Sequence, residues 1–121
     1  MRRPRVERRI SDAVRRIERD EEDGTPARWS LAALARDAAM SRYHFLRVFR
    51  QVIGMTPHQY VLRMRMHRAA VRLRLSDEPV STIAFDAGFN DLSTFNRRFR
   101  RVTGQTPGAY RAAAVRAGRR T

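Results

Sequence analysis

Apolar residues recur every three or four positions along most of the chain, which is the spacing of one face of an α-helix. The first stripe predicts an amphipathic helix over about residues 5–20. Its members are Val6, Ile10, Ala13, Val14 and Ile17. The acidic run Asp20–Asp23 and the Gly24-Thr25-Pro26 segment after it predict the end of this helix and a loop.

The same spacing continues to the C-terminal region, so the whole chain is predicted to be helical. Six further helices are expected, at about 31–38, 41–53, 56–75, 80–87, 91–103 and 107–117. Residues that favour helix ends stand at these boundaries. The expected N-caps are Ser30, Ser41, Thr56, Thr106 and either Asn90 or Asp91, and the expected stops are Gly54 and Gly104. The fold class is therefore all-α, with seven helices.

An internal repeat links the two halves of the chain. When Phe45–Tyr60 is compared with Phe95–Tyr110, nine of the sixteen positions are identical. The matched residues, at an offset of 50, are Phe45/Phe95, Arg47/Arg97, Phe49/Phe99, Arg50/Arg100, Val52/Val102, Gly54/Gly104, Thr56/Thr106, Pro57/Pro107 and Tyr60/Tyr110. Upstream, Leu34-Ala35 and Asp37-Ala38 match Ile83-Ala84 and Asp86-Ala87 at an offset of 49. The pattern predicts a duplicated module.

Each copy of the module combines a short helix, a tight turn and a longer arginine-rich helix, as in helix-turn-helix motifs, whose second helix enters a major groove. We expect an N-terminal helix and a first subdomain over 1–55, a linker helix over 56–75, and a second subdomain over 76–121. A linker of about 20 residues spans roughly 30 Å, and one turn of B-DNA is about 34–36 Å. One chain is therefore expected to place the helices at 41–53 and 91–103 in successive major grooves, as a monomer.

The charge of the chain points to a polyanionic partner. All 26 basic residues are arginine, against 12 acidic ones, and the net charge is +14. Segments 42–74 and 92–121 each hold eight arginines and no acidic residue, which suggests two docking surfaces. The chain has no cysteine, which excludes disulfides, thiolate zinc sites and cysteine nucleophiles. No apolar run is long enough to span a membrane, so a cytoplasmic location is expected.

The second copy resembles the signature of the AraC/XylS transcription regulators. The residues that carry this resemblance are Ile83-Ala84-Phe85-Asp86-Ala87-Gly88-Phe89, Ser93, Phe95, Arg97, Phe99, Arg100, Gly104, Thr106-Pro107 and Tyr110-Arg111. The first copy and the linker are similar to the family too, so the resemblance covers about residues 28–111. It implies two helix-turn-helix units, binding to promoter double-stranded DNA, and activation of transcription through contacts with RNA polymerase.

Position on each arginine-rich helix then assigns roles to its outward side chains. The residues expected to reach base edges are Arg42, Tyr43, Leu46, Arg47, Leu92, Ser93, Asn96 and Arg97. Arg47 and Arg97 suit guanine and Asn96 suits adenine, whereas the two leucines offer only apolar contact, as to a thymine methyl. The residues expected to meet phosphates are Ser41, Arg50, Thr56, Arg100, Arg101 and Thr106.

Simpler interpretations apply to several other residues. Phe45, Val48, Phe49 and Val52 in the first copy, and Phe95, Phe99 and Val102 in the second, are expected on inward faces. Tyr60 and Tyr110 are expected to pack. Asp37 and Asp86 are expected to form local ion pairs. His44, His58 and His67 lack the spacing of a metal site, and we expect neither a metal nor a cofactor.

Two other classes of function were weighed. A non-specific architectural or RNA-binding module would fit the charge, but the duplicated helix pair and the lack of exposed aromatic platforms favour duplex DNA. An enzyme such as a nuclease or an alkyl acceptor would need clustered carboxylates or a cysteine. The sequence therefore predicts a sequence-specific DNA-binding transcription regulator, with activation as the expected role and no enzymatic activity.

Overall fold

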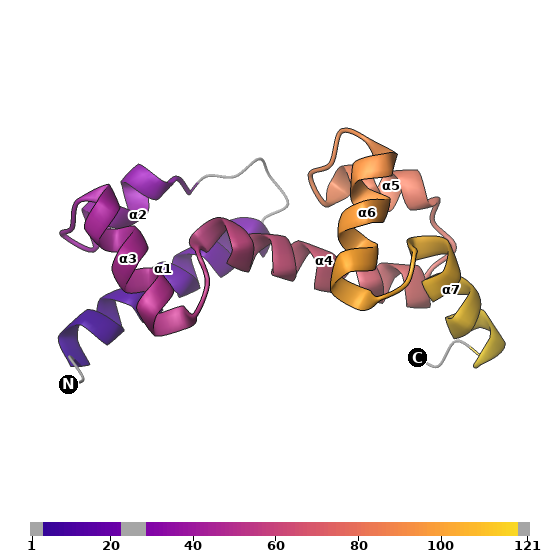
Figure 1. Ribbon diagram of the computed structural model, residues 1–121, viewed down its shortest axis with the longest axis horizontal. Coiled ribbons are helices and arrows are strands. Elements are labelled where there is room, and N and C mark those ends of the chain that lie inside the picture. The colour runs from indigo at the N-terminus through magenta and orange to yellow at the C-terminus, as the bar shows by residue number, and fades with distance from the viewer. Residues whose placement is uncertain (1–3, 23–28, 119–121) are drawn as a thin grey trace. The chain divides into compact units, whose positions relative to one another are not determined.

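The computed structural model describes residues 4–22 and 29–118 of the chain. Within these residues there are seven helices and no strand (Figure 1). The helices are α1 (Pro4–Glu22), α2 (Leu31–Asp37), α3 (Arg42–Ile53), α4 (Pro57–Leu75), α5 (Val80–Asp86), α6 (Leu92–Thr103) and α7 (Pro107–Arg116). The predicted all-α class is confirmed.

The predicted caps account for most helix boundaries. Ser41 Oγ accepts a hydrogen bond from the backbone N–H of His44 at 3.1 Å, and Ser30 caps α2 in the same way. At α4, Thr56 Oγ1 accepts from the N–H of Gln59 at 3.2 Å, and Gln59 Oε1 accepts from the N–H of Thr56 at 2.9 Å. This reciprocal pair satisfies two backbone donors at once. Asp91, one of the two residues considered, is the cap of α6.

The first helix is two residues longer than the sequence predicts. It ends at Glu22 and not at Asp20. Trp29 Nε1 donates a hydrogen bond to Glu21 Oε2 at 3.2 Å, and the Trp29 side chain is almost completely buried. This contact holds the last turn of α1. The predicted loop at Asp23–Pro26 lies outside the described residues.

The chain divides into two compact units, Met1–Val61 and Leu62–Thr121. In the first unit the core side chains that are essentially inaccessible to solvent come from α1, α2, α3 and the first residue of α4. They are Ile10, Ile17, Leu34, Phe45, Phe49 and Pro57. In the second unit the corresponding core comes from α4, α5 and α6. It contains Met66, Ala69, Leu73, Ile83, Ala84, Ala87, Phe95 and Phe99, with Phe89 and Tyr110 packed against it.

The cores show that the duplication is larger than the helix pair predicted from sequence. Buried Ile10, Ala13 and Ile17 of α1 have the same spacing as buried Met66, Ala69 and Leu73 of α4. Arginines flank both sets in the same register. The pattern is Arg-apolar-x-x-Ala-x-x-Arg-apolar, and it occurs at 9–17 and again at 65–73. The later part of α4 is therefore the first helix of the second unit, as α1 is of the first.

The flanking arginines make equivalent contacts in the two units. Arg16 of α1 pairs with Asp37 of α2. Arg72 of α4 pairs with Asp86 of α5 at 2.8 Å and with Glu78 at 2.6 Å. The Arg72 guanidinium holds the pKa of the Glu78 carboxyl below its usual value. The prediction that Asp37 and Asp86 form local ion pairs is confirmed, and each pair ties the short helix of a module to the helix before it.

Aromatic contacts support α3 and α6 in the same way. The rings of Phe45 and Phe49 are 5.7 Å apart, and Tyr60 meets Phe49 edge-on at 6.5 Å. The second unit repeats this with Phe95 and Phe99 at 5.7 Å, and with Tyr110 edge-on to Phe99 at 5.4 Å. Such tilted and edge-on pairs are favourable geometries for aromatic rings. All six rings pack as the sequence predicts.

The expectation that Val52 and Val102 face inward is wrong. Val102 is 52% exposed and Val52 is 39% exposed. Both lie in the last turn of their helices, immediately before Gly54 and Gly104 turn the chain away. The periodicity places them on the inner face of the helix, but in this last turn both side chains remain accessible to solvent.

The left-handed turn after α6 can be tested with a matched pair of glycine substitutions. Gly104 has φ +82, and a Cβ added there would meet no atom within 4 Å. Gly104→Ala should therefore lower the unfolding free energy by about 1–2 kcal/mol, through backbone conformation alone. Gly108 lies inside α7 with open space around it and no positive φ, so Gly108→Ala should raise stability by up to about 1 kcal/mol.

Urea denaturation of both variants measures the two effects. Equal and small changes at the two positions would contradict the role of the left-handed stop.

Candidate nucleic-acid interface

The outward face of α3 follows from the burial of its inward face. Phe45 and Phe49 are fully buried, so the side chains on the other side of this helix point outward. Tyr43, Arg47 and Arg50 lie there and are exposed, and Leu46 beside them is half-buried. Arg42 is exposed as the first residue of the helix. The α3 segment contains no acidic residue, so this face is positively charged.

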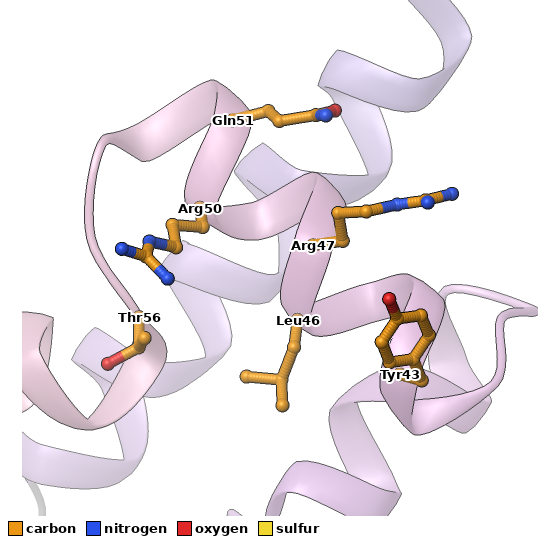
Figure 2. Close-up of a pocket in the computed structure, with 6 residues that line it drawn as sticks. All are labelled: Tyr43, Leu46, Arg47, Arg50, Gln51 and Thr56. Atoms are coloured by element: carbon orange, nitrogen blue, oxygen red, sulfur yellow. The ribbon is translucent and has the colours of Figure 1, made fainter.

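A shallow concavity of about 550 Å³ lies on this face. Six residues line it, namely Tyr43, Leu46, Arg47, Arg50, Gln51 and Thr56. Figure 2 shows Leu46, Arg47 and Arg50 projecting from α3, with the Tyr43 ring next to Arg47 and Thr56 on the segment that follows the helix. The wall of the concavity is mainly apolar, and charged or polar groups stand at its edges. Such a surface can take an apolar group while cations contact its neighbours.

Two of these side chains contact each other. The Cζ atom of Arg47 lies 5.8 Å from the centroid of the Tyr43 ring. A cation at this distance is attracted by the electrons of the ring face. The tyrosine thereby restrains the arginine, and both remain exposed.

The outward face of α6 is built on the same plan with different side chains. Phe95 and Phe99 are fully buried, and Leu92, Ser93, Arg97, Arg100 and Arg101 are exposed. Asn96 is half-buried at the edge of this face. The α6 segment also lacks acidic residues. This face therefore carries three arginines, as many as that of α3, and it has Ser93 and Asn96 where α3 has Tyr43 and Leu46.

The cap residue Asp91 defines the start of α6. Its carboxylate accepts hydrogen bonds from the Thr94 hydroxyl at 2.8 Å and the Ser93 N–H at 3.0 Å. The pKa of Asp91 is lowered, first by the Thr94 hydrogen bond, then by the Ser93 N–H and more weakly by the Arg97 charge. The carboxylate therefore orients the first turn of α6, where Leu92 and Ser93 lie.

The structure leaves every predicted contact residue at least partly accessible. It gathers Tyr43, Leu46, Arg47, Arg50 and Thr56 around one concavity. Ser41 and Arg42 do not line it, and the Ser41 hydroxyl accepts the cap hydrogen bond of α3. The predicted base and phosphate contacts themselves stay predictions.

Gln51 is the lining residue that the sequence analysis missed. It is exposed on α3 and stands at the repeat position of Arg101. The offset of 50 residues was therefore a signal that could have found it.

Other chemistry has little support in the described part of the chain. Over residues 4–22 and 29–118, no three His, Cys, Asp or Glu side chains form a group that could hold a metal ion. None of the described helices combines the length and the apolar character needed to cross a bilayer.

Comparison with known proteins agrees with this geometry. Residues 34–113 match the family described as a helix-turn-helix domain. The regulatory protein SoxS of Salmonella typhimurium is 35% identical over 82 residues, which cover 68% of this chain and 77% of SoxS. The chain belongs to the AraC/XylS family. Another relative, 37% identical over 81 residues, is named as the probable transcriptional regulator LumQ of Photobacterium leiognathi, and neither of these two relatives is named as an enzyme.

Solved structures of AraC-type domains share the fold. A transcriptional regulator of the AraC type from Chromobacterium violaceum superposes with a TM-score of 0.73 at 28% identity, covering 88% of this chain and 91% of the other. The DNA-binding domain of AdpA, solved in complex with a target DNA, gives a TM-score of 0.69 at 33% identity, with coverages of 86% and 90%. The chain thus carries an AraC-type helix-turn-helix DNA-binding domain.

Several AraC-family relatives are much longer than the matched region. The chain spans between about a quarter and a third of the length of three of them. What those longer proteins do as a whole does not transfer with the shared domain.

The capping role of Asp91 can be tested by paired substitutions. Asp91→Ala removes the acceptor and should lower the urea midpoint of unfolding, whereas Asp91→Asn keeps a side-chain oxygen that can accept and should stay close to the parent. Because folding lowers the pKa of Asp91, its contribution is present above the ordinary value of 3.8 and is lost as the pH falls through the folded-state value.

The difference in midpoint between the parent and Asp91→Ala should therefore shrink below about pH 3.8. A difference that does not depend on pH would contradict this account.

Proposed function

We propose that this protein is a sequence-specific double-stranded DNA-binding regulator of transcription, with activation as its role. The observation that carries the proposal is the pair of arginine-rich outward faces on α3 and α6, each opposite a buried pair of phenylalanines. A helix of this kind fits the major groove, where base edges can be read. The similar domain of AdpA was solved on a target DNA, which supports the assignment.

Within this proposal the exposed residues fall into two groups. The base-reading group is Arg42, Tyr43, Leu46 and Arg47 on α3, and Leu92, Ser93, Asn96 and Arg97 on α6. The phosphate-contacting group is Ser41, Arg50, Thr56, Arg100, Arg101 and Thr106. Phosphate contacts supply affinity that does not depend on sequence, and base contacts supply discrimination.

We also propose that one chain uses both helices on the same duplex, in successive major grooves, and acts as a monomer. The α4 helix has 19 residues, or about 28 Å at 1.5 Å per residue, which is close to one turn of B-DNA. RNA polymerase is the proposed protein partner in activation, and the cytoplasm the proposed location.

Selection of bound duplexes from a random pool tests the function. A single asymmetric motif of two short blocks, about one helical turn apart, is the expected result. A palindrome would contradict the two-headed monomer. Absence of any preferred sequence, with equal binding to all duplexes or to RNA, would favour the non-specific architectural alternative, which the net charge of +14 alone also allows.

Arg97 is the test of base readout by α6. Arg97→Ala should weaken binding to the selected duplex by about 1–3 kcal/mol and relax the preference at one base position. The measurement is a repeated site selection together with a titration at fixed salt. Unchanged affinity and unchanged base preference would reject this role.

Arg101 is the matched test of a phosphate contact. Arg101→Ala should weaken binding to all sequences alike and reduce the slope of log affinity against log salt by about 1. Titrations of the selected duplex and of a scrambled duplex at several salt concentrations measure both effects. A changed base preference in this variant would contradict the assignment.

A further inference from the structure

The two outward faces differ at three of the six positions that line the α3 concavity. Arg47, Arg50 and Thr56 have identical counterparts in the second copy, namely Arg97, Arg100 and Thr106. The other three change from Tyr43, Leu46 and Gln51 to Ser93, Asn96 and Arg101. At two of these three positions the first copy has a large side chain with an apolar body, Tyr43 or Leu46, where the second has Ser93 or Asn96, and at the third Gln51 is replaced by the charged Arg101.

We propose that the α3 concavity binds the C5-methyl group of a thymine next to a guanine, so that the first unit reads these two bases in adjacent base pairs (a T-G site). This inference rests on the proposed function, because it assumes that α3 lies in a major groove. To the apolar contact that the sequence suggests for Leu46, it adds Tyr43 as the second wall of the methyl site and places the methyl and the guanine in adjacent base pairs.

The methyl part of the proposal follows from the wall of the concavity. Tyr43 is 73% exposed, although an aromatic ring gains by burial, and Leu46 lies beside it with no polar atom in its side chain. Among the groups at the major-groove edge of the four base pairs, the thymine methyl is the apolar one. A methyl group seated against Tyr43 and Leu46 would remove apolar surface from water on both sides.

The guanine part follows from the contact between Arg47 and Tyr43. The ring lies under the guanidinium at 5.8 Å, which leaves the edge of the planar fork free to donate two parallel hydrogen bonds. Guanine O6 and N7 accept such a pair. Because Tyr43 and Arg47 are in contact, the methyl and the guanine that they read should belong to adjacent base pairs.

The experiment removes the methyl group alone. In the duplex selected by the full chain, the block read by the first unit is first identified as the one whose preference changes in Arg47→Ala. Each thymine of that block is then replaced by deoxyuridine, which lacks only the C5-methyl. One replacement, at the thymine next to guanine, should weaken binding about four-fold, the value expected for one buried methyl.

Two duplex controls accompany this replacement. Cytosine at the same position should bind weakly, and 5-methylcytosine should bind more tightly than cytosine by a similar factor. Deoxyuridine in the block read by α6 should affect the parent and variants of Tyr43 and Leu46 equally, because any methyl contact there belongs to the exposed Leu92.

A variant tests whether Tyr43 and Leu46 carry the effect. Tyr43→Ser combined with Leu46→Asn transfers the second copy's residues to exposed or half-buried positions, where folding is preserved. In this variant the affinities for thymine and deoxyuridine should become equal, while Arg47 still confers a preference for guanine. A methyl effect that persists in the variant would overturn the assignment to these residues.

The remaining outcomes separate this inference from the proposed function. If base changes in the first block weaken binding but no deoxyuridine replacement does, or if the block contains no thymine, the methyl site is wrong and sequence-specific binding stands. If the selection yields no preferred sequence, the proposed function fails and the T-G site fails with it.

Discussion

The burial of two phenylalanines on one side of α3, and of two more on α6, is the constraint on which the rest of the structure depends. Each ring is fully buried, and each pair is closed by a tyrosine from the following helix. Once these faces are buried, helical geometry directs the side chains on the opposite side of each helix outward. Arg47 and Arg97 lie two residues from each ring of their pair, which is about half a turn away, so both are exposed.

The helix before each module completes this arrangement. Arg16 of α1 and Arg72 of α4 pair with an aspartate of the short helix that follows, and the apolar residues around them enter the core. The α4 helix therefore has two roles along its length. Its first turn places Tyr60 on Phe49, as α7 places Tyr110 on Phe99, and its later turns supply Met66 and Leu73 to the second unit.

The residues that are identical in the two copies are of two kinds, those that packing requires and those that it does not. Identical phenylalanines, prolines and tyrosines occupy buried or packed positions. Arg47/Arg97 and Arg50/Arg100 are identical as well, but they are exposed, so packing does not require them. Under the proposed function, contact with a common polyanionic partner accounts for them. Where the copies differ at exposed positions, as at Tyr43 and Ser93, their base preferences should differ too.

The sequence by itself determined the helices, their caps and the inward phenylalanines, because these depend on local periodicity and on side chains that bond to nearby backbone groups. It also determined the family and predicted the contact residues, through a repeat whose offset is 50 over the arginine-rich helices and 49 upstream of them. The tertiary structure decided what depends on neighbours distant in the chain. Trp29 bonds to the last turn of α1, which runs two residues beyond its predicted end, Val102 is exposed although the periodicity places it inward, and the cores revealed that α1 and the later part of α4 are counterparts. The α3 concavity, and the place of Gln51 in it, likewise required α3 and the start of α4 to be folded together, since no local pattern encodes a surface shared by two elements.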